Sequence, residues 1–378
     1  MMDLCTGLAT FAIPLLALQL GASVVELGLI GTAGAIAYTL SCTFTGRLAD
    51  RYNRQRLMGI AALWAALVFA ILIFVQHIWL LLILAPLIWM TLALFWPALQ
   101  ATLAEGKNRA QLVKTLGTFN MVWTIGYMNG PLLGGLFYEV NPRLPFVIAM
   151  IGMFGLAIAI FLIRLKRESA QPDSEETSEE PAQIRDTLRF RKVAWIASFT
   201  GFFVMGILGN QFPKLATELM ISPAVLGYLL AIPRLIQFCI FFIVRRAHFW
   251  QFKLYPLIIP QIATMVGMIM TATVSDPIMI GLGFATVGLL IGSSFTASQF
   301  YSFFQQERKG QGGALHEMIV GIGNVSGPLM GGLLAHMIGL RAPYLLCCVV
   351  LITAILVEYR LIKLHRRDVC RADSCGGS

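Results

Sequence analysis

Long apolar stretches alternate with short polar segments along the whole chain. Each stretch is close to the roughly 20 residues that an α-helix needs to cross the hydrocarbon core of a bilayer. The pattern predicts an all-α integral membrane protein with twelve transmembrane helices. The predicted spans cover residues 4–21, 24–45, 57–76, 78–103, 112–138, 145–163, 193–212, 223–244, 254–273, 277–303, 313–337 and 342–362.

One longer polar segment separates the first six stretches from the last six. Its centre, residues 171–181, reads QPDSEETSEEP and is too acidic and too poor in apolar residues to bury a core. We therefore expect it to be a flexible linker. The predicted organisation is a six-helix bundle over residues 1–163, a linker over 164–192, a second six-helix bundle over 193–362 and a tail over 363–378.

Lysine and arginine are unevenly distributed between the predicted loops. Of the 28 such residues, Arg143, Lys214 and Arg341 fall on one side, Arg234 falls inside a span, and the others lie on the opposite side. Cytoplasmic loops carry the excess of positive charge, which predicts cytoplasmic termini, linker and tail in a multi-pass protein of the cytoplasmic (inner) membrane. This topology accounts for the net charge of +9, so we expect contact with a lipid bilayer and no nucleic acid.

Composition and motifs exclude several classes of function. Only 12% of the residues are charged, against about 25% in soluble globular proteins, which excludes a soluble enzyme with an ordinary surface. The sequence has no H-E-x-x-H, no Walker A and no G-x-S-x-G motif, and its five histidines are dispersed. We therefore expect no enzyme activity, no metal and no cofactor.

The two halves share a glycine-rich segment. Residues 126–136 read GYMNGPLLGGL and residues 323–333 read GNVSGPLMGGL, so seven of eleven positions match. Glycines four residues apart let another helix approach closely, and Pro131 bends its helix; tight packing alone is the alternative interpretation. The residues of this interface glycine motif are Gly117, Gly126, Gly130, Pro131, Gly134 and Gly135 in the fifth span and Gly323, Gly327, Pro328, Gly331 and Gly332 in the eleventh.

The loop after the second span contains an acid among basic residues. It reads GRLADRYNRQR from Gly46 to Arg56. Asp50 can accept backbone N–H groups at a neighbouring helix start, and Arg51 and Arg54 can pair with Glu105 at the end of the fourth span. Such contacts would form a cytoplasmic gate that closes in one conformation, whereas a plain positive-inside anchor is the alternative.

This loop resembles the signature G-x-L-a-D-r-x-G-R-r of the major facilitator superfamily. Gly46, Leu48, Ala49, Asp50, Arg51 and Arg54 match it. Asn53 stands where glycine is usual, and we expect it to keep the turn by adopting the left-handed conformation. The glycine motif of the fifth span is similar to the antiporter motif of the same superfamily, although residues 84–97 lack the arginine that proton-coupled relatives usually carry in the fourth span.

The resemblance covers essentially the whole chain and implies two pseudo-symmetric six-helix bundles that rock around a central site. In that superfamily the glycine motif belongs to exporters that exchange drugs or metabolites for protons. The resemblance therefore implies secondary active transport of a small organic molecule by alternating access, most simply proton-coupled efflux by a monomer, with the proton gradient as its energy source. Gly130, Pro131 and Gly134 are expected to shape the interface between the bundles.

Few ionisable residues fall inside the predicted spans, where charge is costly and by default functional. Arg234 lies near mid-depth and could bind an anionic group, repel cations or hold a helix contact. His316 and Glu317 lie about one turn into the eleventh span, where Glu317 could be a protonation site, part of the gate, or an acid satisfied by the helix start. Asp3 and Glu26 begin spans one and two, and their positions favour interfacial roles.

Aromatic and polar residues gather in the spans expected to line a cavity. The candidates for substrate contact are Trp96, Trp123, Tyr127 and Gln299, near Trp89 and Asn120. An apolar pocket with scattered hydrogen-bonding groups suits an amphipathic molecule, while helix packing is the alternative. Two other functions stay open: uptake or facilitated diffusion of an organic anion through Arg234, and a membrane sensor that does not transport.

Overall fold

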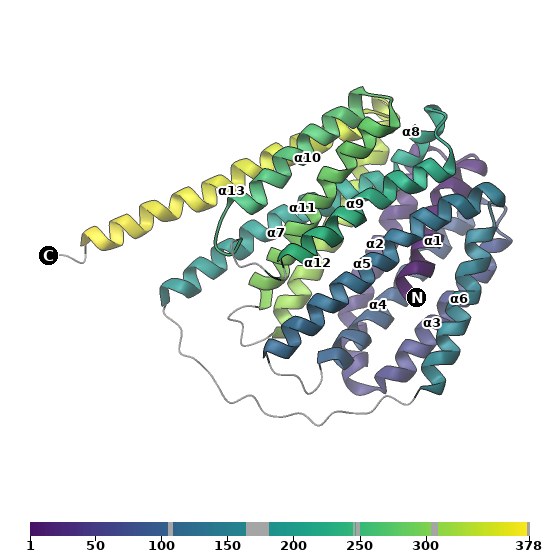
Figure 1. Cartoon of the computed structure of the whole chain (residues 1–378), viewed down its shortest axis with the longest axis horizontal. Helices are drawn as coiled ribbons and strands as arrows, with labels where there is room; N and C mark the ends of the chain where they lie inside the picture. The colour runs from purple at the N-terminus through teal and green to yellow at the C-terminus, as the bar shows by residue number, and fades with distance from the viewer. Residues whose placement is uncertain (105–108, 164–180, 245, 247–249, 304–308, 376–378) are drawn as a thin grey trace.

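The computed structural model describes residues 1–104, 109–163, 181–244, 246, 250–303 and 309–375. This part of the chain folds into twelve long helices and one short one, which confirms the all-α prediction (Figure 1). The helices are α1 (Met2–Gln19), α2 (Val24–Arg51), α3 (Arg54–Ile73), α4 (Ile78–Ala104), α5 (Arg109–Val140), α6 (Leu144–Leu162), α7 (Pro181–Asn210), α8 (Phe212–Glu218), α9 (Pro223–Val244), α10 (Tyr255–Thr273), α11 (Pro277–Phe303), α12 (Lys309–Met337) and α13 (Ala342–Cys375).

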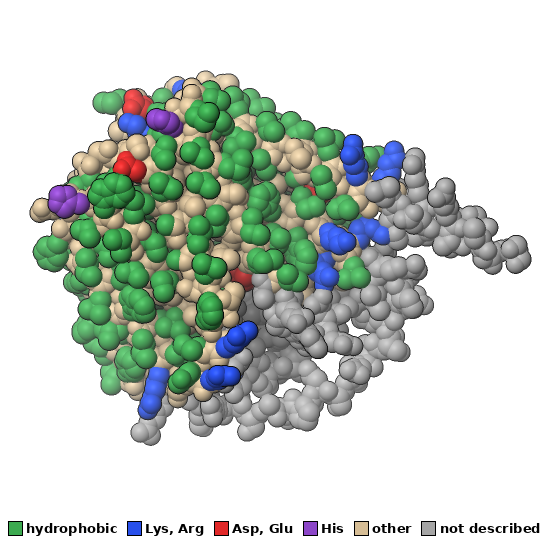
Figure 2. All heavy atoms as spheres, turned by 180° about the vertical axis from the view of Figure 1, so that it is seen from behind, with side chains coloured by type: hydrophobic (Ala, Val, Ile, Leu, Met, Phe, Trp, Pro, Cys, Tyr) green, Lys and Arg blue, Asp and Glu red, His purple; other side chains and the backbone are tan. Residues whose placement is uncertain are grey.

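The long helices have the dimensions and surface of a multi-pass membrane protein. Within the described residues, eleven helices are long and apolar enough to cross a membrane, and α5 is the remaining long helix. Large apolar side chains such as Leu67, Ile71 and Phe154 are more than half exposed. Figure 2 shows hydrophobic side chains over most of one face, with Lys and Arg mainly toward its borders. Such a surface is stable against lipid, where helices satisfy their own backbone polar groups.

Several helix boundaries differ from the predicted spans, among them the end of α2, which lies at Arg51 rather than at residue 45. Helix α7 begins at Pro181, inside the segment assigned to the linker, and α13 continues through the predicted tail to Cys375. The seventh span ends at Asn210, and the chain then starts the short helix α8, where Pro213 occupies the first turn. Proline is favourable there because the first N–H groups of a helix have no partner inside it.

Helices α1–α6 pack mainly on one another, and so do α7–α13. Two helix pairs form most of the contact between these groups: α2 with α12, and α5 with α9. In Figure 1 the four helices run through the middle of the molecule, between the peripheral helices α3 and α6 on one flank and α10 and α13 on the other. Each of the four therefore has a face directed at the opposite group.

Most glycines of the motif in α5 pack within their own group. A Cβ on Gly126 would lie 2.6 Å from the Asp3 Cβ, one on Gly134 would lie 2.9 Å from the Phe11 ring, and one on Gly130 would collide with the backbone of Gly7. All three neighbours belong to α1. The expectation that Gly130 and Gly134 form the interface between the bundles is therefore wrong, because these residues set the spacing between α1 and α5.

The duplicated motif in α12 repeats this arrangement against α7. A Cβ on Gly323 would lie 3.0 Å from the Phe202 Cβ, and one on Gly331 would lie 3.0 Å from the Ile207 side chain. A Cβ on Gly327 would collide with the carbonyl oxygen of Phe203. The two halves therefore use the same glycine spacing for equivalent contacts inside each group.

The prolines and last glycines of the two motifs make the contacts between the groups. A Cβ on Gly227 of α9 would collide with the Pro131 carbonyl oxygen, and one on Gly135 with the carbonyl of Pro223. In the equivalent pair a Cβ on Gly28 of α2 would lie 2.5 Å from the Pro328 carbonyl oxygen. A Cβ on Gly332 would lie 2.9 Å from the carbonyl oxygen of Val24 in α2. The prediction that Pro131 lies at this interface agrees with its position.

These contacts lie toward one end of the molecule. We call the end that holds the connection between α2 and α3 the basic side; Gly28, near the start of α2, lies at the opposite end. There Glu139 of α5 accepts a hydrogen bond from the Ala224 N–H at the start of α9 (3.0 Å). The pKa of Glu139 is lowered because the Ala224 N–H and the Ser222 hydroxyl donate to its carboxylate. The contact is therefore formed above the ordinary pKa of a glutamate and is lost as the pH falls through the lowered value.

We expect Gly130→Ala to destabilise the protein, because the added methyl group collides with the backbone of α1 and neither helix can yield locally. Overpacking of this kind costs about 1–3 kcal/mol. Gly155→Ala is the matched control, since a Cβ there meets nothing within 4 Å, and alanine favours a helix over glycine. Thermal unfolding in detergent measures both, and equal melting temperatures for Gly130→Ala and the unmodified protein would contradict the packing described.

Candidate functional site

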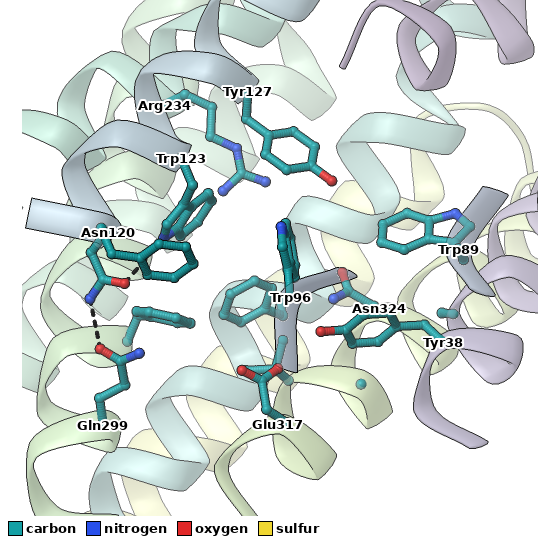
Figure 3. Close-up of a pocket in the computed structure, with 16 residues that line it drawn as sticks. Tyr38, Trp89, Trp96, Asn120, Trp123, Tyr127, Arg234, Gln299, Glu317 and Asn324 are labelled. Carbon is teal, nitrogen blue, oxygen red and sulfur yellow. Dashed lines mark hydrogen bonds between the residues drawn. The ribbon is translucent and has the colours of Figure 1, made fainter. Parts of the chain in front are cut away.

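A cavity lies between the two helix groups. It is lined from α2, α4 and α5 on one side and from α7, α9, α11 and α12 on the other. Figure 3 shows the side chains that enclose it. The structure brings six of the predicted residues together here: Trp96, Trp123, Tyr127, Arg234, Gln299 and Glu317.

Aromatic rings form most of the wall. The Trp123 ring meets Tyr127 edge-on at 5.9 Å between ring centroids and Phe295 at 6.0 Å. Trp96 lies 6.4 Å from Trp123 and 6.1 Å from Tyr38. Contacts of this geometry hold the rings in place, so the wall is preformed and offers ring faces and edges to a ligand.

Arg234 enters the cavity from α9. Its Nη1 donates to Gln237 Oε1 (2.8 Å), one turn further along the same helix. The guanidinium carbon lies 5.7 Å from the centre of the Trp123 ring and 5.6 Å from that of Tyr127. Within the described residues no carboxylate forms an ion pair with it. Cation–π contacts of this kind stabilise a desolvated cation by about 2 kcal/mol and leave its charge uncompensated.

Glu317 enters the same cavity from α12. Figure 3 shows it at the end of the pocket remote from Arg234, with the Tyr38 hydroxyl of α2 directed toward it. The Cys42 thiol, one turn beyond Tyr38, is the other group of α2 that interacts with this carboxyl. Among the residues whose side chains are described, no cation pairs with it. The cavity thus holds one acid and one base that do not pair with each other.

A hydrogen bond between the two groups crosses the cavity wall. Asn120 Nδ2 of α5 donates to Gln299 Oε1 of α11 (2.8 Å), and Asn120 Oδ1 accepts from Trp123 Nε1 (3.1 Å). The predicted polar residue Gln299 therefore has a partner on the opposite group. The Asn120–Gln299 pair holds the Trp123 ring in place. Its hydrogen bond breaks when α5 and α11 move apart.

His316 lies outside the pocket, although it neighbours Glu317 in sequence. Its Nδ1 forms a 2.6 Å hydrogen bond with Ser298 Oγ of α11, and its ring packs edge-on against Phe295 at 4.7 Å. Only 1% of its surface is exposed. The structure therefore assigns His316 to helix packing between α11 and α12, and its expected role as a substrate or coupling residue is not supported by its position.

Glu26 forms a capping box at the start of α2. Its Oε2 accepts from the Ser23 N–H (2.7 Å) and the Ser23 hydroxyl (2.8 Å), while its own N–H donates to Ser23 Oγ (3.3 Å). This arrangement satisfies backbone groups that a helix start leaves open. The interfacial expectation for Glu26 agrees with its place, and its position outside the cavity argues against a coupling role.

The predicted gate loop is described in part. The backbones of Gly46 and Asp50 belong to α2, but the Asp50 side chain and the whole of Glu105 lie outside the described residues. Arg51 is exposed, and Arg54 Nε donates to the Ala49 carbonyl (3.2 Å). The gate contacts of this loop remain a prediction.

Asn53 does not take the left-handed conformation expected of it. Its φ is −64° and its ψ is 111°, and its side chain accepts from the Arg56 N–H (3.1 Å). The residue is the N-cap of α3, a position that asparagine favours because its side chain satisfies an open N–H group. Capping, rather than backbone freedom, keeps this turn.

Sequence reasoning missed several residues that the fold brings to the cavity. They include Tyr38 and Asn324, which line it. Asp3, which the sequence analysis placed at the membrane interface, lies against Gly126 with Oδ1 buried and without a hydrogen-bond partner among the described residues. Gly126 is near the middle of α5, so Asp3 is deeper than the interfacial position predicted for it. The spacing of Gly28, Ala35 and Tyr38 along one face of α2 is the signal that identifies Tyr38.

Comparisons with known proteins agree with this architecture. Residues 1–303 match the sequence profile of the Major Facilitator Superfamily. The chain is 26% identical over 90% of its length to the multidrug resistance protein MdtG of Escherichia coli O9:H4 (strain HS), covering 85% of that protein. It is 22% identical over 97% of its length to the quinolone resistance protein NorA of Staphylococcus aureus (strain MRSA252), covering 95% of it.

Solved structures show the same fold. A bacterial homologue of the human lysosomal transporter Spinster, in an inward-facing and occupied conformation, superposes with a TM-score of 0.77 at 14% identity and covers 96% of this chain and 94% of its own. A point mutant of the nucleoside transporter NupG gives a TM-score of 0.70 at 13% identity, with 95% of this chain and 97% of that chain covered.

We expect His316→Ala to lower stability, because it leaves the buried Ser298 hydroxyl without its partner and opens a cavity beside Phe295. Changes of this type cost about 2–4 kcal/mol. His336→Ala is the control, since His336 is an exposed histidine of the same helix. Thermal unfolding in detergent gives the melting temperature of each variant. Equal melting temperatures for His316→Ala and His336→Ala would contradict a packing role for His316.

Proposed function

Because the chain belongs to the major facilitator superfamily, we propose that it exports amphipathic organic molecules from the cell in exchange for protons. The chain is a transporter and not an enzyme. The observation that carries the proposal is the aromatic cavity between the two groups, which holds Arg234 and Glu317 without an ion pair between them. A site shared by two halves of a transporter is exposed to either side when the halves rock.

The positive-inside rule supports an orientation with the basic side, and with it both termini, in the cytoplasm of the inner membrane. The contacts at Gly28 and Gly227 then hold the two groups together toward the outer end, which supports entry of a molecule from the cytoplasm in this state. The cavity is built within one chain, which supports a monomer as the working unit.

Three observations favour efflux driven by protons. The names of the two relatives describe resistance to multiple drugs and to quinolones. The α5 glycine motif resembles that of exchangers in this superfamily. Glu317 supplies an acid inside the cavity, where protonation removes a charge that a low-dielectric environment penalises. A proton and a cationic group then compete for one carboxylate, which is the basis of exchange.

Arg234 favours a second function. A guanidinium with no carboxylate partner among the described residues would bind an organic anion, and uptake or facilitated diffusion of such an anion needs no competition with protons. The direction of proton movement separates the two functions.

We expect Glu317→Gln to abolish the exchange of protons for substrate, because glutamine has a similar shape and does not titrate. Inside-out vesicles holding a pH gradient, reported by a fluorescent amine, receive amphipathic cations such as ethidium, neutral compounds and carboxylates one at a time. At least one compound collapses the gradient with the unmodified protein, and the same compound has no effect with Glu317→Gln.

Glu26→Gln is the matched control, since Glu26 forms a helix cap outside the cavity; it should retain full gradient collapse. A panel in which no compound collapses the gradient would favour passive transport and overturn the proposal. If the gradient still collapses with Glu317→Gln, the transported proton binds to a group other than Glu317.

We expect Asp50→Asn to reduce transport several-fold while the protein remains folded in the membrane. The substitution removes the charge on which the gate loop depends and affects only the state in which the cytoplasmic side is closed. The initial rate of ethidium transport, normalised to the amount of protein in the vesicles, measures the effect. A normal transport rate for this variant would indicate that the loop is only a positive-inside anchor and not a gate.

A further inference from the structure

We propose that the cavity selects aromatic zwitterions, with the anionic group of the substrate at Arg234 and its ammonium group at Glu317. This inference rests on the proposed function and specifies its substrate class. Figure 3 shows the two charged side chains at opposite ends of the cavity, with aromatic rings between them. One uncompensated charge of each sign in one cavity is complementary to a molecule with both charges and no net charge.

The Arg234 end is built to receive an acid. One hydrogen bond of its guanidinium goes to Gln237, and the rings of Trp123 and Tyr127 orient the group without neutralising it. A guanidinium has five N–H donors in a planar fork, so donors remain for a ligand. A carboxylate matches this fork with two parallel hydrogen bonds.

The Glu317 end is built to receive a base. The groups of α2 that face it are the Tyr38 hydroxyl and the Cys42 thiol, neither of which carries a positive charge at neutral pH. His316, next to it on α12, turns away to Ser298, and Arg234 is the cation across the cavity. Among the described residues, an ionised Glu317 therefore has a hydrogen-bond donor in Tyr38 but no cationic partner until a proton or an ammonium group arrives.

The space between the two ends suits a planar aromatic body. Trp96, Trp123 and Phe295 border it, and aromatic faces bind other aromatic rings by offset or edge contacts. A molecule with charges at both ends thus places its apolar part against the apolar wall.

The sign of the coupling also selects a zwitterion over a simple anion. An anion at Arg234 cancels the positive field that favours ionised Glu317, so it promotes protonation and would travel together with the proton. An ammonium group at Glu317 displaces the proton, so the two travel in opposite directions. A zwitterion obtains the affinity of the Arg234 contact and retains exchange with protons at Glu317.

Three matched naphthalenes test the proposal. They are 6-(aminomethyl)-2-naphthoic acid, its methyl ester, which keeps only the positive charge, and its N-acetyl derivative, which keeps only the negative charge. Their intrinsic fluorescence reports accumulation in energised inside-out vesicles. We expect the unmodified protein to accumulate the zwitterion at least about tenfold better than either derivative at equal concentration.

The variants assign each charge to its end of the cavity. With Arg234→Gln, the zwitterion and its methyl ester should accumulate to the same extent. Arg234→Lys keeps the charge and should retain part of the preference for the zwitterion over the ester. With Glu317→Gln, the zwitterion and its N-acetyl derivative should bind with equal affinity, as measured by fluorescence anisotropy. Arg246→Gln and Glu26→Gln, charge changes outside the cavity, should leave both preferences intact.

Equal accumulation of the three naphthalenes by the unmodified protein would overturn the inference. So would a loss in Arg234→Gln that affects all three alike, because it would indicate a structural role. Ethidium in the same vesicles tests the proposed function separately from the substrate class. If ethidium collapses the gradient but the protein shows no preference for the zwitterion, the substrate class is rejected and proton-coupled export is retained.

Discussion

The close approach of helix backbones between the two groups determines the rest of the structure. The carbonyl oxygens of Pro131 and Pro328 lie against Gly227 and Gly28, where any side chain would force the helices apart. These four positions lie on stripes that continue along each helix at intervals of three, four or seven residues, so one face provides both the contact and the cavity wall. The stripes are Gly28, Gly31, Ala35 and Tyr38 on α2; Pro131, Tyr127, Trp123 and Asn120 on α5; Gly227 and Arg234 on α9; and Pro328, Asn324, Gly321 and Glu317 on α12.

The duplicated halves share this geometry but differ in chemistry. By the offset that relates Gly126 to Gly323, Asn120 corresponds to Glu317 and Tyr127 to Asn324, and all four line the cavity. The first half thus supplies an amide and an aromatic ring where the second supplies an acid and an amide. The backbone contacts of the two halves are equivalent, but their cavity side chains differ. A pseudo-symmetric fold therefore encloses an asymmetric site.

Electrostatics inside the membrane explains why so few charged groups suffice. A charge in a low-dielectric site is costly unless it is compensated, and Arg234 and Glu317 are the charged side chains that line the cavity. The rings around Arg234 stabilise its charge without cancelling it, and the capping role of Glu26 shows that an acid at a helix start can be satisfied locally. The difference between these acids lies in their surroundings and not in their residue type.

The sequence by itself determined the class of the protein, the helices, the internal repeat and much of the cavity. Hydrophobic length and the distribution of lysine and arginine are local properties, and the polar and aromatic residues Trp96, Trp123, Gln299 and Arg234 were predicted from their place in spans. Only the tertiary structure decided which way each side chain points. His316 and Glu317 are about 100° apart around one helix, and nothing in their order shows which one meets Ser298 and which one meets the cavity. The same applies to Gly130 and Gly135, because the partner of a glycine depends on the helix that packs against its face.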